Sequence, residues 1–374
     1  MKKIGIVTHH KFYNQGTMLQ AFALQQKLVD LKCDVQIINY TTEKHKTKLK
    51  DKILRIIKKP SLIYIKLLRQ ITSKINIKGK KDSIEAFDKF YNNIKLSGEK
   101  YTNVQEMLNN PPIYDIYIVG SDQTWNFNIP TNSPVYLLNF VPAGKTKCSY
   151  APSVGSKIIN SEHIKMFGKY LKDFKYISCR DISGKDILEK VVDKPIELVL
   201  DPTFLLTKEE WLKVSNKVNI KGEYVLLYFL GINKRNINIA KQIAKTLKMK
   251  VISIYNFDSL KIIEKDSVFG IGPSEFIYLV NNAKLICTDS FHGIAFSIIM
   301  NKQFYAFMKN KNNLKSDNNR IKEILEKFKL LDRLVTNKKD INYNNIDYNI
   351  VNEILSKEKE QSEQYLKKCI GEED

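Results

Sequence analysis

One short segment of the chain places a carboxylate, a hydroxyl, an imidazole and a glycine within five consecutive residues, Asp289-Ser-Phe-His-Gly293. An apolar run, 283–287, ends just before these residues, and a second apolar run, 294–300, follows them. Thr288, Asp289 and Ser290 belong to the residue types that cap helix N-termini. The pattern therefore predicts a buried strand, a tight polar turn and a helix with His292 in its first turn.

His292 is the residue of this segment best suited to proton transfer, because imidazole titrates near neutral pH. Backbone N–H groups in the first turn of a helix carry partial positive charge and bind anions. The carboxyl end of a strand is also where open α/β sheets bind ligands. The segment therefore predicts an anion site with an acid or base beside it, although His292 could instead simply pack at a strand–helix corner.

Four more polar segments follow predicted strands in the first half of the chain. They are Asn14-Gln-Gly16, Gly120-Ser-Asp-Gln-Thr-Trp-Asn126, Ser149 to Gly155, and Arg180. A guanidinium at a sheet edge fits a carboxylate or phosphate in bidentate fashion, although Arg180 could instead pair with Asp181 or Asp201. The aromatic face of Trp125 suits a sugar, and a position in the core is the alternative for this side chain.

The first predicted strand, 4–7, is followed by two histidines and then by a helix that begins near Thr17. Asn14 and Gly16 could contact a ligand at the start of this helix, or the glycine could serve the turn alone. His9 and His10 could face the same ligand or be solvated in the loop. The loop lacks the G-x-G-x-x-G pattern, so dinucleotide binding is not indicated.

Strands and helices alternate in both halves of the chain, which predicts an α/β fold with two Rossmann-like domains facing a cleft. Asp201-Pro202 interrupts the first pattern and a new strand begins at Tyr224, so we place the domains at residues 1–205 and 206–374. The second domain ends in a charged helix, 350–370. The five cysteines are scattered without a C-x-x-C pair, so neither a disulfide framework nor a metal site is expected.

The formal net charge of +21 over 374 residues is concentrated in the segment 44–81, which holds 14 Lys and Arg residues and one acid. Apolar residues are threaded through these lysines, and we interpret the segment as a basic helical insertion in the first domain. It could contact an anionic membrane surface or be a solvated insertion. Nucleic-acid binding is disfavoured, because Tyr64 is the one aromatic residue available for stacking.

The sequence contains no segment typical of a signal peptide or a membrane span. We therefore expect a cytoplasmic protein, peripheral on the inner face of the membrane if the basic segment binds lipid.

In their order and spacing the polar segments resemble the polysaccharide pyruvyl transferase family, from the first strand to about Arg320. The matching motifs are Asn14-x-Gly16 with Leu19-Gln-Ala21, Gly120-Ser-Asp-Gln-x-Trp-Asn126, Ser149-Tyr-Ala151, Cys179-Arg-Asp-x-Ser183, Asp201-Pro-Thr203 and Asp289-Ser-Phe-His-Gly293. The resemblance implies a fold like that of the glycosyltransferase-B enzymes. It also implies transfer of a pyruvyl group from phosphoenolpyruvate to two hydroxyls of one sugar, as a cyclic ketal, in a surface polysaccharide or lipid-linked glycan precursor.

The resemblance places His292 and Arg180 in the active site. Many members carry an arginine where this chain has Ser290, and Arg320 is our candidate to replace it. We expect His292 to be the general acid–base, with Asp289 or Asp122 assisting. The donor is expected to contact Arg180, Ser290, Gly293 and Arg320, and the acceptor to contact Asn14, Gly16, Ser121, Trp125 and His10. Phosphoenolpyruvate is the expected donor substrate, and no cofactor is expected.

Two other functions are compatible with the sequence, because a fold does not fix a function. The first is a nucleotide-sugar-dependent glycosyltransferase on the same fold. The second is a non-catalytic binding or scaffold protein, whose cleft has lost the arginine at Ser290.

Overall fold

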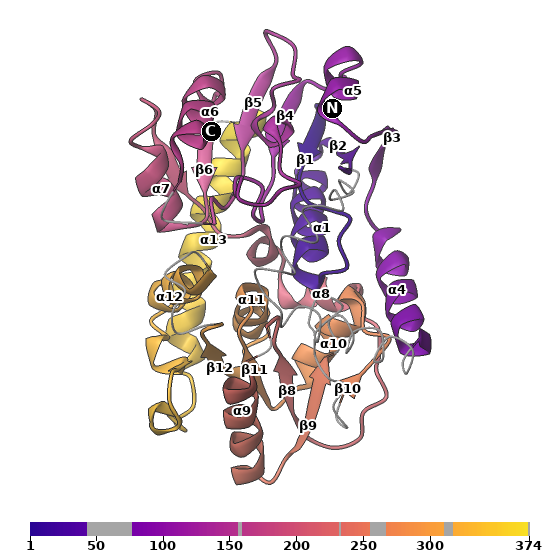
Figure 1. Ribbon diagram of the computed structural model, residues 1–374. Helices are drawn as coiled ribbons and strands as arrows, with labels where there is room; N and C mark the ends of the chain where they lie inside the picture. Colours follow the sequence, from indigo (N-terminus) through magenta and orange to yellow (C-terminus); the bar gives the residue numbers. More distant parts are fainter. Residues whose placement is uncertain (43–76, 156–158, 232, 255–266, 310–316, 373–374) are drawn as a thin grey trace, which may run out of the picture.

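The computed structural model describes residues 1–42, 77–155, 159–231, 233–254, 267–309 and 317–372, and contains two large parallel β-sheets flanked by helices (Figure 1). The basic segment interpreted as a helical insertion, 44–81, lies outside the described residues except for 77–81. These five residues open helix α4.

The first sheet is parallel throughout and has the strand order β3-β2-β1-β4-β5. A smaller parallel pair, β6 and β7, continues beside β5 through a bridge between Cys148 and Tyr176. The strands are β1 (Lys3–Val7), β2 (Asp34–Tyr40), β3 (Leu96–Tyr101), β4 (Ile116–Val119), β5 (Thr146–Ser149), β6 (Ile177–Cys179) and β7 (Ile196–Leu198). The helices of this half are α1 (Gln15–Asp30), α4 (Ile77–Tyr91), α5 (Val104–Asn109), α6 (Ser161–Leu171), α7 (Ile182–Leu188) and the short η1 (Pro134–Leu137) and η2 (Pro202–Leu205).

The second sheet is also parallel throughout and has the order β10-β9-β8-β11-β12-β13. Its strands are β8 (Tyr224–Tyr228), β9 (Lys250–Ile254), β10 (Ser267–Val268), β11 (Leu285–Thr288), β12 (Gln303–Phe307) and β13 (Leu334–Val335). The helices are α8 (Lys208–Lys213), α9 (Lys234–Thr246), α10 (Pro273–Asn282), α11 (Phe291–Ile299), α12 (Asp317–Lys327), α13 (Tyr348–Ile370) and the short η3 (Leu331–Arg333) and η4 (Lys338–Asp340).

The central strands of both sheets have the sequence pattern expected of buried parallel strands. β4, β8 and β11 are buried along their whole length and are apolar except for Thr288 at the end of β11, as is typical of parallel strands covered by helices on both faces. In both sheets the strand order reverses beside the first strand, since β1 lies between β2 and β4 and β8 lies between β9 and β11. Such a reversal opens a crevice at the carboxyl edge. The prediction of an α/β fold with two Rossmann-like domains is confirmed.

The two halves share one apolar core, which packs across the junction between the sheets. Phe22 of α1 lies 5.8 Å, ring centre to ring centre, from Trp211 of α8, and Trp211 lies 5.0 Å from Phe296 of α11. All three side chains are buried. The carboxyl edges of the two sheets are therefore held against each other by α1, α8 and α11.

The last helix, α13, contacts both halves of the chain (Figure 1). Near its start the hydroxyl of Tyr348 donates to the carbonyl of Ser297 (3.1 Å). Near its end the hydroxyl of Tyr365 donates to the carbonyl of Ser149 (2.8 Å), and the backbone N–H of Leu200 donates to Ser362 Oγ (2.9 Å). The expected domain boundary at residue 205 lies between the two sheets. The C-terminal helix α13, which was expected to belong to the second domain, also packs against the first domain.

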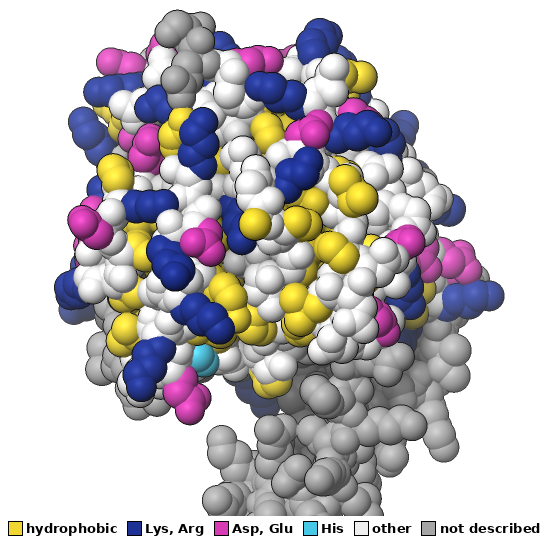
Figure 2. Space-filling model, turned by 90° about the horizontal axis from the view of Figure 1, so that it is seen from above, with side chains coloured by type: hydrophobic (Ala, Val, Ile, Leu, Met, Phe, Trp, Pro, Cys, Tyr) yellow, Lys and Arg dark blue, Asp and Glu magenta, His cyan; other side chains and the backbone are white. Residues whose placement is uncertain are grey.

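The end of the molecule remote from the second sheet carries Lys and Arg side chains interspersed with Asp, Glu and apolar side chains (Figure 2). No helix in the described part of the chain is long and apolar enough to cross a membrane.

Candidate active site

The candidate site lies where the N-termini of α1 and α11 meet. Gly16 of α1 packs directly against the imidazole of His292 on α11, and a Cβ atom added at Gly16 would lie 2.0 Å from His292 Nδ1. Glycine is therefore required here for close approach between the two halves. Gln15 also reaches across the junction, where its Oε1 accepts from the hydroxyl of Tyr228 (3.1 Å). Asn14 is occupied as the N-cap of α1, since its Oδ1 accepts from Thr17 N (3.2 Å).

Arg180 is the cation at the centre of the site. Its side chain is 1% exposed, and its guanidinium bonds through Nη1 to Asp201 and to Ser121 Oγ (3.2 Å). Its Nη2 lies 3.6 Å from Asp122 Oδ1, and the ring of Phe291 lies 4.6 Å from the guanidinium carbon. Its Nε lies 3.8 Å from Asp181 Oδ1, so the predicted alternative of an ion pair with Asp181 or Asp201 is confirmed for both carboxylates. Because Phe291 belongs to the second half, this arginine also joins the two halves.

Asp201 connects Arg180 to His292. Its Oδ2 lies 3.8 Å from His292 Nε2, and its Oδ1 accepts from the backbone N–H and the hydroxyl of Thr203 (3.0 and 2.7 Å). Burial alone would raise the pKa of Asp201, but its interactions with His292 and the charge of Arg180 outweigh burial and hold that pKa below its usual range. Asp201 is therefore a carboxylate that can orient the imidazole and stabilise its protonated form.

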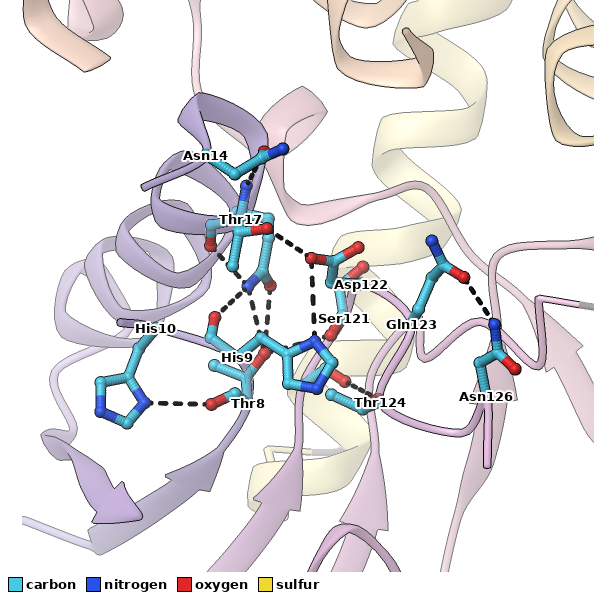
Figure 3. A network of polar contacts seen from close by, with 12 residues as sticks. Thr8, His9, His10, Asn14, Thr17, Ser121, Asp122, Gln123, Thr124 and Asn126 are labelled. Carbon is cyan, nitrogen blue, oxygen red and sulfur yellow. Dashed lines mark hydrogen bonds and ion pairs between the residues drawn. The ribbon is translucent and has the colours of Figure 1, made fainter. Parts of the chain in front are cut away.

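Asp122 is a second buried carboxylate beside the same guanidinium. It stands in the left-handed region, with φ +67°, and its Oδ2 accepts from the hydroxyl of Thr17 (2.7 Å) and lies 3.9 Å from His9 Nδ1 (Figure 3). Burial would raise the pKa of Asp122, but the interaction with His9 and the charge of Arg180 hold that pKa well below its usual range. Asp122 thus stays charged within the site.

Three buried donor nitrogens in the site lack a hydrogen-bond acceptor among the described residues. They are Nε of Arg180, which lies 3.8 Å from Asp181 Oδ1, Nη2 of Arg180, 3.6 Å from Asp122 Oδ1, and Nε2 of His292, 3.8 Å from Asp201 Oδ2. Leaving a buried polar group unpaired costs about 1–3 kcal/mol, and more for a charged group. An anionic ligand with several oxygens would satisfy these donors.

Arg320 approaches the same place from α12. Arg180, Phe291 and Arg320 line one small pocket of about 30 Å³, together with Glu323 and a wall of apolar side chains, among them Phe204. Its volume has room for one or two water molecules.

Ser290 and Gly293 lie at the start of α11, as the sequence predicts. Ser290 is the N-cap, and its Oγ accepts from the backbone N–H of Gly293 (3.3 Å). One donor of the helix start is therefore already used within the cap.

Three predicted site residues, Asp289, Trp125 and His10, make contacts that direct their side chains away from a ligand. Both oxygens of Asp289 accept backbone N–H groups after β8, from Leu230 (2.6 Å) and Gly231 (3.2 Å). Trp125 lies in the core of the first half, where its Nε1 donates to the carbonyl of Tyr136 (2.8 Å), so its face is not available to a sugar.

His10 points away from His9 and Asp122 (Figure 3). Its Nδ1 lies 3.1 Å from the carbonyl oxygen of Thr8, and its ring stacks on Tyr91 at 6.1 Å. Burial lowers the pKa of His10 to about 4, so this imidazole is neutral at pH 7. His10 is thus buried away from the candidate site.

Several residues of the site lie outside the predicted set, among them Asp201, Thr17 and Phe291, and His9 is expected there only as an alternative to solvation in its loop. In the sequence, Asp201 marks the end of the first domain and is a possible partner of Arg180, and its place shortly after a strand is the available signal. Thr17 had been noted as the start of a helix, and nothing in the sequence showed that its hydroxyl would reach Asp122. In the parts of the chain that the structure describes, no three His, Cys, Asp or Glu side chains are grouped to hold a metal ion.

A family model described as polysaccharide pyruvyl transferase matches residues 14–310. The chain belongs to the polysaccharide pyruvyl transferase family. No curated protein matches the chain.

Among solved structures, this pyruvyl transferase family member is similar to sugar-nucleotide epimerases. A UDP-GlcNAc 2-epimerase from Methanocaldococcus jannaschii in complex with UDP-GlcNAc and UDP aligns with a TM-score of 0.50 and 14% identity, over 98% of each chain. A UDP-N-acetylglucosamine 2-epimerase from Rickettsia bellii aligns with a TM-score of 0.51 and 11% identity, again over 98% of each chain. At this level of identity the likeness shows the shared glycosyltransferase-B-like fold.

Proposed function

We propose that this chain transfers a pyruvyl group from phosphoenolpyruvate to two hydroxyls of one sugar, forming a cyclic ketal on a surface polysaccharide or a lipid-linked glycan precursor. The observation that carries the proposal is a set of three buried nitrogens at the junction of the two halves, Arg180 Nε and Nη2 and His292 Nε2, which face carboxylates at 3.6–3.8 Å and have no hydrogen bond among the described residues. The carboxylate and phosphate of phosphoenolpyruvate would supply the missing acceptors.

His292 is the proposed acid for the carbon chemistry. Ketal formation requires a proton at C3 of the donor, and His292 Nε2 faces the site with Asp201 at 3.8 Å to stabilise the imidazolium. Arg180 and Arg320 would hold the anionic groups of the donor. Both line the small pocket beside Phe291, which would have to widen beyond its room for one or two water molecules when the donor binds. Asp289 has no part in this scheme, because both of its oxygens hold backbone N–H groups.

The acceptor is proposed to bind on the side of the first half, near Gly16 and Ser121. Ser121 belongs to the loop after β4 and is fully buried, and its Oγ already bonds Asp201 Oδ2 (2.8 Å), the carbonyl of Ala151 (2.9 Å) and Arg180 Nη1 (3.2 Å), so it would position these groups beside the acceptor. A sugar hydroxyl held beside Ser121 would be next to the donor held by Arg180. No cofactor enters the scheme.

Calorimetric titration with phosphoenolpyruvate tests the donor assignment. Arg180→Lys keeps a cation but loses the planar guanidinium, whose Nη1 bonds both Asp201 and Ser121 and whose other nitrogens are proposed to contact the donor, so we expect donor affinity to fall at least tenfold. Arg235→Lys, an exposed arginine on α9, is the matched control and should bind as the wild type does. Equal affinity in Arg180→Lys and the wild type would remove Arg180 from the donor site.

A nucleotide-sugar-dependent glycosyltransferase is the alternative on the same fold. Titrating a panel of nucleotide-sugars in parallel decides between the two functions. Binding of a nucleotide-sugar, with no binding of phosphoenolpyruvate, would replace our proposal with this alternative.

A further inference from the structure

Two histidine–carboxylate pairs contact the guanidinium of Arg180 through their carboxylates. His292 of the second half faces Asp201 at 3.8 Å, and His9 of the first half faces Asp122 at 3.9 Å. Both rings are nearly buried, with His9 5% and His292 7% exposed. Arg180 contacts both carboxylates, so the two pairs belong to one charged network.

The neighbours of His9 fix which of its nitrogens carries the hydrogen. The amide nitrogen of Asn132 donates to the carbonyls of Gln123 (2.7 Å), Thr124 (3.2 Å) and Asn126 (3.0 Å). Its oxygen must therefore be the atom that faces His9 Nε2 at 2.9 Å, and it can only accept. Nε2 of His9 then carries the hydrogen, and Nδ1 is the nitrogen that is free to take up a proton.

The position of Asp122 suits it to support a charged His9. The left-handed backbone at Asp122 is uncommon for a residue with a side chain, and strain of this kind clusters at functional sites. The hydroxyl of Thr17 fixes Oδ2, the oxygen that faces His9 Nδ1 (Figure 3). A proton arriving at Nδ1 would therefore be stabilised by a carboxylate already in place, as at His292.

We propose that His9, through Nδ1, is a second acid–base group of this site, and that His9 and His292 exchange roles between the two halves of the reaction. This inference rests on the proposed function. In the first step one sugar oxygen bonds to C2 of phosphoenolpyruvate, its hydroxyl proton passes to His9, and His292 gives its proton to C3, which becomes a methyl group. In the second step the other sugar oxygen bonds to C2, its proton passes to His292, and the bond from C2 to the phosphate oxygen breaks while His9 protonates the leaving phosphate.

This sequence returns both histidines to their starting states. Two protons leave the sugar hydroxyls, one reaches C3 and one reaches phosphate, so the products are the ketal and inorganic phosphate. Each imidazole gives one proton and takes one in every turnover. No oxidant, metal or further co-reactant is required.

The histidine tautomer can be measured on the full-length protein without any ligand. Long-range ¹H–¹⁵N correlation spectra at alkaline pH distinguish the two neutral tautomers of imidazole, and the signal missing in His9→Gln assigns His9. We expect His9 to carry its hydrogen on Nε2. A hydrogen on Nδ1 would overturn the proposal, because that nitrogen could not accept a proton.

The kinetic test uses His9→Gln with phosphoenolpyruvate and a panel of nitrophenyl hexosides. Glutamine keeps a donor for Asn132 but lacks the proton-accepting nitrogen, so we expect kcat to fall about 10²–10⁴-fold while KM for the donor changes less than about threefold. The pH dependence of kcat for His9→Gln should also lack one of the two limbs seen in the wild type, because one titrating group has been removed. His163→Gln, on α6, is the matched control and should retain wild-type rates.

Failure of the inference differs from failure of the proposed function. If the wild type forms the ketal and His9→Gln does so within about threefold and with the same pH profile, His9 has no acid–base role and the proposed function stands. If the wild type does not bind phosphoenolpyruvate, the proposed function itself falls, and the two-histidine scheme falls with it.

Discussion

Gly16 is a residue at which the two halves of the site are in direct contact. A methyl group there would overlap the imidazole of His292, with 2.0 Å between the added Cβ and Nδ1. We expect Gly16→Ala to displace His292 and to lower kcat at least tenfold, with a stability cost of about 1–3 kcal/mol. Denaturant unfolding and steady-state rates check both effects.

Gly98 supplies the control for this substitution. It lies on β3, and an added Cβ would meet no atom within 4 Å. Gly98→Ala should leave activity unchanged. A Gly16→Ala variant with wild-type activity would show that His292 can move without loss of function.

His10 makes the stability of the fold depend on pH. Its pKa is about 4 in the folded chain and about 6.5 in an unfolded one, so the unfolded state binds more protons between these values. Stability is therefore full above pH 6.5 and falls as the pH drops towards 4, by up to about 3 kcal/mol. The depressed carboxylates Asp122 and Asp201 act in a different window, because they lose their stabilising effect only below about pH 4.

Chemical unfolding across this pH range measures the effect. His10→Phe keeps a ring against Tyr91 and removes the titrating group, so its stability should change less between pH 6.5 and 4 than that of the wild type. Identical slopes in the two proteins would show that His10 is not the group responsible.

Single residues also show how far the sequence could predict the site. His292, Arg180 and Asp122 follow predicted strands, and the structure brings these three together because parallel strands end at the same edge. Trp125 and Asp289 also follow strands, yet they turn into the core and onto backbone N–H groups. Sequence position gives the edge of the sheet, whereas the direction of each side chain depends on packing.

At the scale of elements, helix α12 of the second half is hydrogen-bonded to helix α7 of the first half. Glu323 of α12 accepts the backbone N–H groups of Ile182 (3.0 Å) and Ser183 (3.4 Å) in the first turn of α7, as a helix cap would. We expect Glu323→Ala to lower the unfolding free energy by about 1 kcal/mol and to weaken donor binding, because the pocket beside Arg320 would open.

Glu326 lies on the same helix and provides the comparison. It forms an exposed pair with Lys322 (3.4 Å), and such pairs contribute about 0–1 kcal/mol. Glu326→Ala should leave donor affinity unchanged. Equal effects of Glu323→Ala and Glu326→Ala would show that the contact with α7 does not hold the halves together.

The elements themselves were largely readable from the sequence. The strand predicted at 4–7 is β1, and the helix predicted at 350–370 is contained in α13. The course of α13 back to the first sheet was not predictable, because it depends on distant contacts such as Tyr365 with Ser149. The local periodicity of apolar residues predicts where a helix or strand forms, but it does not predict which other element that helix or strand packs against.

At the scale of the whole molecule, the basic segment 44–81 is the proposed membrane contact, and residues 44–76 of it lie outside the described structure. Replacing Lys48, Lys52, Lys58 and Lys59 with Glu should weaken binding to anionic vesicles by at least 10²-fold, at about 1 kcal/mol per lysine. Added salt should weaken binding of the unaltered protein steeply. Vesicle co-sedimentation measures both.

The control for this set reverses four lysines elsewhere, Lys213, Lys217, Lys221 and Lys245, which are exposed in the second half. This variant carries the same change in net charge and should bind vesicles more tightly than the first variant. Equal binding by both variants would show that net charge, rather than the basic segment, determines any attraction to the membrane.

The central claim concerns the fate of C2 of the donor, and carbon NMR follows that atom directly. The chain would be incubated with [2-¹³C]phosphoenolpyruvate and a panel of hexosides. Our account predicts that the enol carbon signal is replaced by that of a saturated carbon bonded to two sugar oxygens, with one phosphate released per ketal, and that His292→Asn forms none. Consumption of nucleotide-sugars by the same preparation, with phosphoenolpyruvate left intact, would contradict the account.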